Sequence, residues 1–109
     1  MTRARVLHVL RSHSLSRHTG RVSCAHLGEI TVTELPAEIE GCEECLKTGG
    51  WWVHLRMCSS CGHIGCCDNS PSRHATAHFH ETSHPIIRSA EPGEEWSWCY
   101  VDEVAFELA

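Results

Sequence analysis

The sequence predicts a small domain of the α+β class. The chain has 109 residues, a length typical of a single domain. Residues 51–57 alternate between apolar and polar side chains, as in a half-buried strand. Residues 71–83 carry the signals of one main helix, and the stretch after them reads as two short strands. A domain of this size buries a thin core, so it often needs support from a metal ion or from disulfides.

Charge divides the chain into two parts. Residues 1–21 hold five arginines and no acidic residue, so we expect a basic, disordered N-terminal tail. Residues 22–109 hold four basic residues against fourteen acidic ones, a formal charge of −10, and form the predicted folded domain. An acidic domain lacks the basic surface that nucleic-acid phosphates require, so we expect no nucleic-acid partner.

The chain shows no apolar stretch that is long enough to cross a membrane and no segment typical of a secretion signal. We therefore expect no membrane contact, a cytoplasmic location and a reducing environment. In such an environment closely spaced cysteines indicate metal binding more often than disulfides. The chain contains eight cysteines and ten histidines, so its chemistry is expected to lie with these residues.

The predicted domain begins with the pair Cys24-x-His26. A weak alternation follows at residues 30–35, Pro36 interrupts it, and the sequence Lys-Thr-Gly-Gly at residues 47–50 predicts a turn.

The strand predicted at residues 51–57 has one apolar face and one more polar face. We expect the core to be contacted by Trp51, Val53, Leu55 and Met57. The opposite face carries Trp52, His54 and Arg56. A tryptophan on that face either covers a neighbouring element or contacts a partner, since aromatic residues are enriched at interfaces.

Prolines mark both ends of the helix predicted at residues 71–83. Ser70 is a candidate N-cap, and Pro71 occupies the first helical position, where no amide hydrogen is needed. Pro85 disfavours helical backbone in the residue before it, so the helix should end by about Ser83. Beyond it we expect a short apolar strand, a Pro-Gly turn, and a strand that carries Trp96, Trp98, Cys99 and Tyr100.

The cysteines and histidines have the spacing of zinc ligands. Tetrahedral zinc takes thiolate and imidazole ligands, often as Cys-x2-Cys pairs. His74 and His78 are four positions apart and therefore share a helix face. The candidate ligands are Cys42 and Cys45, Cys58 and Cys61, either Cys66 or Cys67, and His74, His78 and His84, enough for two closed sites. We interpret His54, His63 and His80 as surface residues or as neighbours of the ligands.

Other interpretations of this pattern are weaker. Disulfides require an oxidising compartment, and a thioredoxin-like dithiol requires a βαβ unit that the sequence does not show. A catalytic zinc keeps one coordination position open beside a general base. The sequence lacks the His-Glu-x2-His motif and the zinc-deaminase signature. We therefore expect no enzymatic activity, and we expect zinc whose role is to supply folding free energy.

The order of these residues from Cys24 to Glu103 resembles the UBP-type zinc finger, the ubiquitin-binding finger of deubiquitinating enzymes, and above all its small stand-alone bacterial members. The resemblance rests on Cys24-x-His26, the two Cys-x2-Cys pairs, Trp52, Cys66, His74-x3-His78-x5-His84-Pro85 and the triplet from Trp98 to Tyr100. It implies a twisted antiparallel sheet packed against one main helix, and a cross-brace in which the two zinc sites alternate along the chain.

The resemblance also implies how the ligands are grouped. One zinc would be held by Cys42, Cys45, Cys66 and His74. A second would be held by Cys58, Cys61, His78 and His84. A third site would combine Cys24, His26, Cys99 and Asp102, where Asp102 stands in place of the cysteine that some members have. A carboxylate is also an accepted zinc ligand.

The family uses an aromatic groove to bind the free C-terminal diglycine of ubiquitin, and here its walls would be Trp52, Trp98 and Tyr100. An arginine two residues after the third cysteine of the first site helps to bind that tail in the family, but Asp68 occupies this position here. Its charge would repel a carboxylate, which argues against ubiquitin-type diglycine binding. The expected partner of this monomeric domain is therefore the tail of another peptide or protein.

The sequence also allows an alternative function. The adjacent thiols of Cys66 and Cys67 predict a redox- or metal-responsive protein that releases zinc when they are oxidised.

Overall fold

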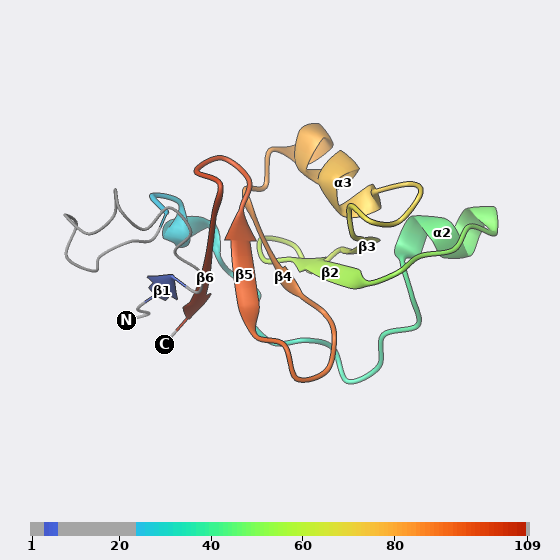
Figure 1. Ribbon diagram of the computed structural model, residues 1–109, viewed down its shortest axis with the longest axis horizontal. Coiled ribbons are helices and arrows are strands. Elements are labelled where there is room, and N and C mark those ends of the chain that lie inside the picture. The colour runs from blue at the N-terminus through green and yellow to red at the C-terminus, as the bar shows by residue number, and fades with distance from the viewer. Residues whose placement is uncertain (1–3, 7–23, 109) are drawn as a thin grey trace.

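The computed structural model describes residues 4–6 and 24–108, and its main element is one antiparallel sheet (Figure 1). The strands are β1 (Ala4–Val6), β2 (Leu55–Cys58), β3 (Ile64–Cys66), β4 (Ile86–Ser89), β5 (Trp96–Cys99) and β6 (Val104–Leu108). They lie in the order β1-β6-β5-β4-β2-β3, and every neighbouring pair is antiparallel. The helices are the 3-10 helix η2 (Leu27–Glu29) and the α-helices α2 (Glu43–Thr48) and α3 (His74–Thr82). The predicted α+β class, with one main helix on an antiparallel sheet, is confirmed.

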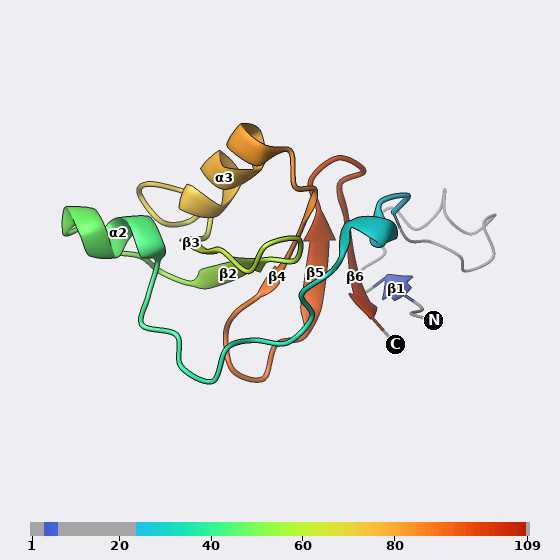
Figure 2. The ribbon, with the colours of Figure 1, turned by 180° about the vertical axis from the view of Figure 1, so that it is seen from behind.

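Helix α3 packs on β2 and β3, at the end of the sheet away from β1 (Figures 1 and 2). Helix α2 lies at this same end and contacts β3. The close approach of α3 depends on Gly65 in β3, because a Cβ atom there would lie 2.8 Å from the backbone nitrogen of Ala75. The absence of a side chain at this one position therefore lets the helix contact the sheet directly.

Replacing Gly65 with alanine is expected to destabilise the domain by about 1–3 kcal/mol, because the added methyl group has no space between β3 and α3. The measurement is chemical denaturation of the zinc-loaded protein. Gly28→Ala is the matched control, since a Cβ atom at Gly28 meets nothing within 4 Å. Equal stability of the two variants would contradict the proposed role of Gly65.

The strand predicted at residues 51–57 begins only at Leu55. Leu55 and Met57 are buried as predicted, with 8% and 0% of their surface exposed. The prediction that Trp51 and Val53 face the core is wrong, because they are 64% and 43% exposed. Residues 51–54 lie outside any strand, so no neighbouring strand imposes an alternation of faces on them.

Trp52 does not lie on an outward face either. Its partly buried ring packs against the core cluster that contains Leu55 and Met57. The ring lies against the backbone of Gly41, where a Cβ atom would come within 2.4 Å of it. Trp52 therefore covers the core beside α2.

Helix α3 begins at His74, so the predicted start at residue 71 is wrong. Ser70 does not cap the helix, because its hydroxyl accepts a hydrogen bond from the N–H of Val53 at 2.9 Å. The N–H of His74 donates instead to Cys66 Sγ at 3.2 Å. The sulfur atom of Cys66, in β3, thus accepts the hydrogen bond of the first N–H group of the helix. This contact with another element overrides the local signals at Ser70 and Pro71.

The end of α3 and the strands after it agree with the prediction. The helix ends at Thr82, and its C-cap Ser83 adopts the left-handed conformation before the turn toward Pro85. The apolar strand that follows is β4, and the strand that carries the tryptophans is β5. Helix α2 is an element that the prediction lacks, since only a turn at residues 47–50 was expected. In the structure Gly49 is the C-cap of α2 and adopts the left-handed conformation.

Cysteines contribute to both buried clusters of the domain. One cluster consists of Cys42, Cys45, Leu55, Met57, Ile64, Cys66 and Ala90. The other consists of Cys24, Ile86, Cys99 and Phe106. Large apolar side chains are few in each, so the stability of this interior depends on what the thiols bind.

The predicted basic tail lies mostly outside the described residues. Only Ala4–Val6 is described, as strand β1, which pairs with β6 and places Val6 opposite Phe106. The edge of β6 offers these three residues a backbone partner. The disordered tail at residues 1–21 stays a prediction. Within the described part of the chain, no helix has the length and apolar character needed to cross a membrane.

Candidate metal centres and aromatic pocket

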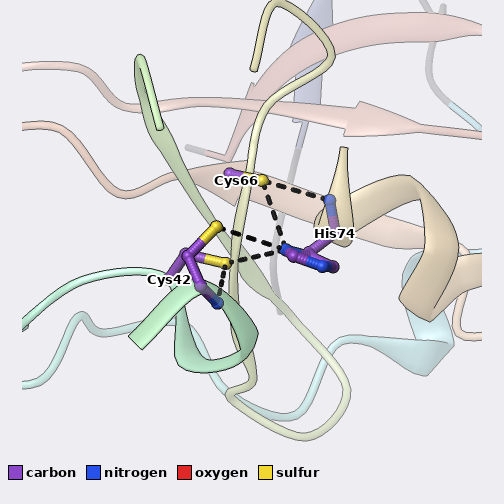
Figure 3. A group of neighbouring side chains, drawn as sticks. Cys42, Cys66 and His74 are labelled. Carbon is purple, nitrogen blue, oxygen red and sulfur yellow. Dashed lines mark hydrogen bonds between the residues drawn. The ribbon is translucent and has the colours of Figure 1, made fainter. Parts of the chain in front are cut away.

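The first cluster joins α2, β3 and α3 through Cys42, Cys45, Cys66 and His74, whose donor atoms all lie within 4.8 Å of one another. Figure 3 shows Cys42, Cys66 and His74 pointing toward one another. The Nδ1 atom of His74 lies 3.2, 3.4 and 3.6 Å from the sulfur atoms of Cys42, Cys45 and Cys66. A tetrahedral zinc with ordinary bond lengths would separate sulfur from nitrogen by about 3.6 Å. The spacing of these atoms therefore fits one zinc ion.

The local backbone supports thiolate sulfur in this cluster. Cys42 is the N-cap of α2, and its sulfur accepts a hydrogen bond from the N–H of Cys45 at 3.4 Å. Cys66 accepts from the N–H of His74 at the start of α3. Hydrogen bonds of this kind favour the charged form of a thiol, and each here comes from a helix N-terminus.

The thiols are nevertheless costly to ionise by themselves. Burial raises the pKa of Cys45 to about 12, and the thiols of Cys42 and Cys66 add to the rise. Burial also raises the pKa of Cys42. A divalent cation in the same space supplies the compensating charge and displaces the thiol protons. The chemistry of the donor set thus favours a metal ion over free thiols.

The second cluster joins the end of β2 to the end of α3 through Cys58, Cys61, His78 and His84. Cys58 Sγ lies 3.4 Å from His84 Nδ1, and Cys61 Sγ lies 3.3 Å from His78 Nε2. Burial lowers the pKa of His78, and the neighbouring imidazoles of His63 and His84 lower it further. The neutral ring, which is the form that binds zinc, is therefore favoured.

Residues of the two clusters alternate along the chain. Residues 42 and 45 belong to the first, 58 and 61 to the second, 66 and 74 to the first, and 78 and 84 to the second. This order agrees with the predicted cross-brace. Helix α3 presents one histidine to each cluster, so it would be held to the sheet at two points.

His63 and Glu44 connect the two clusters. The ring of His63 stacks on that of His78, with centroids 4.1 Å apart, and its Nε2 lies 2.7 Å from Glu44 Oε2. Burial raises the pKa of Glu44, but the hydrogen bond and charge of His63, a backbone hydrogen bond and the charge of His74 together leave this pKa below its usual value. His63 is thus a neighbour of the candidate ligands, as predicted, whereas Glu44 lies in a helix that the prediction lacks.

A third group lies at the other end of the domain and consists of Cys24, His26, Cys99 and Asp102. His26 Nδ1 lies 3.5 Å from Cys99 Sγ and 3.2 Å from Asp102 Oδ2. Burial raises the pKa of Cys24 to about 12, against the lowering effect of the His26 N–H and with a contribution from the thiol of Cys99. The donors fit a metal ion, with Asp102 in the position that the resemblance assigned to a cysteine.

The structure distinguishes the adjacent thiols of Cys66 and Cys67. Cys66 joins the first cluster, whereas Cys67 belongs to none of the three groups. The sulfur of Cys67 lies 3.5 Å from the hydroxyl oxygen of Ser70, and 5% of the residue is exposed.

A pocket of about 240 Å³ lies on the sheet face that α3 borders. It is lined by Arg56, Cys67, Asp68, Asn69, Ile87, Trp96, Trp98 and Tyr100. The strand register explains part of this lining, because Cys58, Ile87 and Trp98 lie side by side across β2, β4 and β5. Alternation then places Arg56 and Trp96 on the same face as Ile87 and Trp98.

Two of the three predicted groove residues, Trp98 and Tyr100, line this pocket, but Trp52 does not. The partly buried ring of Trp52 packs instead against the core beside Gly41. Arg56 and Trp96 take part instead, with the guanidinium carbon 4.6 Å from the centroid of the Trp96 ring. Their alternation with buried neighbours, in β2 and β5, was the sequence signal that could have placed them on this face.

Tyr100 is fixed by neighbours from α3. Its ring stacks on Phe79 with centroids 4.5 Å apart, and its hydroxyl oxygen lies 3.1 Å from Thr76 Oγ1. Burial raises the pKa of Tyr100 to about 12, so the phenol stays uncharged at neutral pH. The pocket therefore combines an uncharged aromatic wall with one cation, Arg56, and one anion, Asp68.

Residues 42–107 match the model of a family described as Zn-finger in ubiquitin-hydrolases and other protein. The chain belongs to this zinc-finger family. The resemblance seen in the sequence is thereby confirmed. A UBP-type zinc finger is a zinc-finger module and not a catalytic domain. Together with the Cys/His clusters, membership identifies zinc as the cofactor of the domain.

Curated relatives of this UBP-type zinc finger are much longer proteins. Ubiquitin carboxyl-terminal hydrolase 44 from Ailuropoda melanoleuca is 30% identical over 82 residues, which are 72% of this chain and 10% of that protein. The BRCA1-associated proteins of Mus musculus and Homo sapiens are each 36% identical over 66 residues, 61% of this chain and 10% of theirs. The chain thus spans about a tenth of the length of these relatives.

A solved structure matches over most of the UBP-type zinc finger. It is the solution NMR structure of a protein from Rhodopseudomonas palustris, with 59% sequence identity and a TM-score of 0.69. The match covers 80% of this chain and 83% of that one.

Proposed function

We propose that this UBP-type zinc finger is a non-catalytic module that binds the free C-terminal tail of a peptide or protein. One structural zinc is bound by Cys42, Cys45, Cys66 and His74, and a second by Cys58, Cys61, His78 and His84. Each set supplies four protein donors, which complete a tetrahedral coordination and leave no position for a reacting water. The zinc ions therefore stabilise the fold, and binding takes place in the pocket lined by Arg56, Trp96, Trp98 and Tyr100.

The third group binds a further zinc in this proposal, and Asp102 supplies its only oxygen donor. Asp102→Asn is expected to reduce the zinc content from three ions to two per chain, because an amide is a far weaker zinc ligand than a carboxylate. The change keeps a side-chain oxygen for the hydrogen bond from the Ala25 N–H. Elemental analysis after dialysis is the measurement, with the exposed neighbour Glu103→Gln as control. A third zinc that remains in Asp102→Asn would show that the carboxylate is not a ligand.

The pocket is the observation that supports tail binding. Trp96, Trp98 and Tyr100 offer apolar walls for an extended backbone, and Arg56 offers a guanidinium for a terminal carboxylate. Arg56 comes from β2, whereas the family arginine would follow Cys66. Position 68 holds an aspartate in place of the family arginine, but Arg56 of β2 supplies a cation to the same pocket. This supports a ligand that ends in a free carboxylate.

The test is an NMR titration of the zinc-loaded, ¹⁵N-labelled full chain with a peptide that ends in free Gly-Gly. The same peptide with a C-terminal amide is the control. We expect the indole N–H signals of Trp96 and Trp98 to shift with the free acid and not with the amide. Trp51 and Trp52 lie outside the pocket, so their indole signals serve as internal references.

Equal shifts of the pocket signals with acid and amide would show that the pocket does not recognise the carboxylate. The absence of any shift, also with peptides that end in other residues, would contradict tail binding as a whole.

The alternative redox function is favoured by one observation, namely a thiol that lies outside the metal clusters and next to a candidate ligand. If Cys67 acts as a switch, its thiol is the first to be oxidised. Peroxide should then release zinc from the wild type and not from Cys67→Ser, which lacks this thiol. Because Cys67 is buried, we do not expect this difference. We expect zinc to be released slowly, and at the same rate, from the wild type and from Cys67→Ser. A colorimetric zinc assay during exposure to hydrogen peroxide is the measurement. Release that depends on Cys67 would support the switch.

A further inference from the structure

Arg56 and Asp68 carry opposite charges and line the same pocket, but they do not pair with each other. No ion pair among the described residues includes either of them. Opposite charges that share a small pocket without contact leave both available to a bound molecule. The same pocket is also lined by the aromatic side chains of Trp96 and Trp98 in β5 and of Tyr100 directly after it.

The Arg56 guanidinium is held in place but keeps most of its hydrogen-bonding capacity. It stacks on Trp96, and its Nη1 donates to the carbonyl of Leu55 at 2.9 Å. A guanidinium has five N–H donors in a planar fork that matches a carboxylate. Within the described part of the chain no second acceptor bonds to it, so donors remain for a ligand carboxylate.

The Asp68 carboxylate is positioned in a comparable way. Its Oδ1 accepts a hydrogen bond from Thr76 Oγ1 at 2.6 Å, and Thr76 in turn contacts the hydroxyl of Tyr100. Its Oδ2 accepts no hydrogen bond from the described residues. A fixed, exposed carboxylate beside aromatic rings is suited to a ligand cation, which gains both ionic and cation–π attraction.

We propose that the pocket prefers a C-terminal tail whose last residue is lysine. Its terminal carboxylate binds the Arg56 fork, its methylene stem lies on the aromatic walls, and its ammonium group reaches Asp68. This inference rests on the proposed function, and it specifies which tails the pocket selects. An acidic last residue would place a second negative charge near Asp68, and a glycine would leave Asp68 without a cation.

The test compares peptides that differ only at the last residue. Tryptophan fluorescence or calorimetry gives Kd values for zinc-loaded full chain with peptides that end in lysine, norleucine or glutamate as free acids, and in lysine amide. We expect the lysine acid to bind about five- to tenfold more tightly than the norleucine acid, a range that discounts the exposed ion pair for solvent screening. Norleucine keeps most of the apolar stem and removes the charge.

A matched variant isolates the contribution of Asp68. Asp68→Asn keeps an oxygen that accepts from Thr76 but removes the negative charge. In this variant the Kd of the norleucine acid divided by that of the lysine acid should fall to about one. In the control Glu81→Gln the ratio should stay as in the wild type, because Glu81 is exposed on α3 and does not line the pocket.

The outcomes separate this inference from the proposed function. If all free acids bind equally and the amide does not, tail binding stands and the preference for lysine is wrong. If the lysine acid binds no better than the lysine amide, both are wrong. A preference for lysine that persists in Asp68→Asn would also overturn the inference, because another group would then select the cation.

Discussion

Replacing Cys58 with serine is expected to release zinc from the second cluster and to unfold the domain. Cys58 is the last residue of β2 and is 2% exposed. Its sulfur atom lies 3.4 Å from Nδ1 of His84, which follows the end of α3. Structural zinc contributes about 10–16 kcal/mol of apparent folding free energy per site in small finger peptides. That exceeds what a core with few large apolar side chains can supply, so loss of one zinc should not be tolerated.

The measurement combines zinc content with the dispersion of the amide signals in an NMR spectrum. Cys67→Ser is a matched control, because it is the same substitution at a buried cysteine outside all three groups. We expect this control to keep its zinc and its fold. A Cys58→Ser protein that stays folded with full zinc content would show that the ligand set of the second cluster is wrong.

Replacing Arg56 with methionine is expected to weaken the binding of free-acid tails about 10- to 100-fold. The estimate corresponds to the loss of hydrogen bonds to a charged group, about 1.5–3 kcal/mol. Methionine keeps an apolar stem beside Trp96, so the aromatic packing should survive. Arg56→Lys should give an intermediate affinity, because it keeps the charge and loses the planar fork.

Calorimetric titration with the same free acid gives the affinity of each variant. Arg73→Met is the control for net charge, since Arg73 is exposed and does not line the pocket. Equal weakening in Arg73→Met would indicate a general effect of charge. Unchanged affinity in Arg56→Met would show that Arg56 does not hold the carboxylate.

The candidate metal groups were largely predictable from the sequence. Cysteines three positions apart, and histidines four positions apart on a helix, are close in space through local geometry alone. His84 could be placed as well, because Pro85 ends the helix just before it. Local reasoning did not separate Cys66 from Cys67, since the direction of each side chain depends on the register of β3 against β2.

The pocket was less predictable. The alternation at residues 51–57 suggested an outward Trp52, but the strand begins later, and Trp52 turns into the core over Gly41. Arg56 and Trp96 are far apart in sequence and meet because β4 lies between β2 and β5. The order of strands in a sheet depends on how their apolar faces pack in the folded domain. It therefore cannot be predicted from the spacing of residues along the chain.

The sequence by itself thus determined the class of the domain, its family, and the residues that converge on zinc, because the ligand spacing and the helix period act over short distances. Only the tertiary structure decided where α3 begins, which thiol joins the first cluster, and which charges share a pocket. The start of α3 depends on Cys66, a residue of another element, whose sulfur accepts the first helical N–H. Arg56 and Asp68 likewise reach one pocket only through the antiparallel pairing of the sheet and the packing of α3 against it.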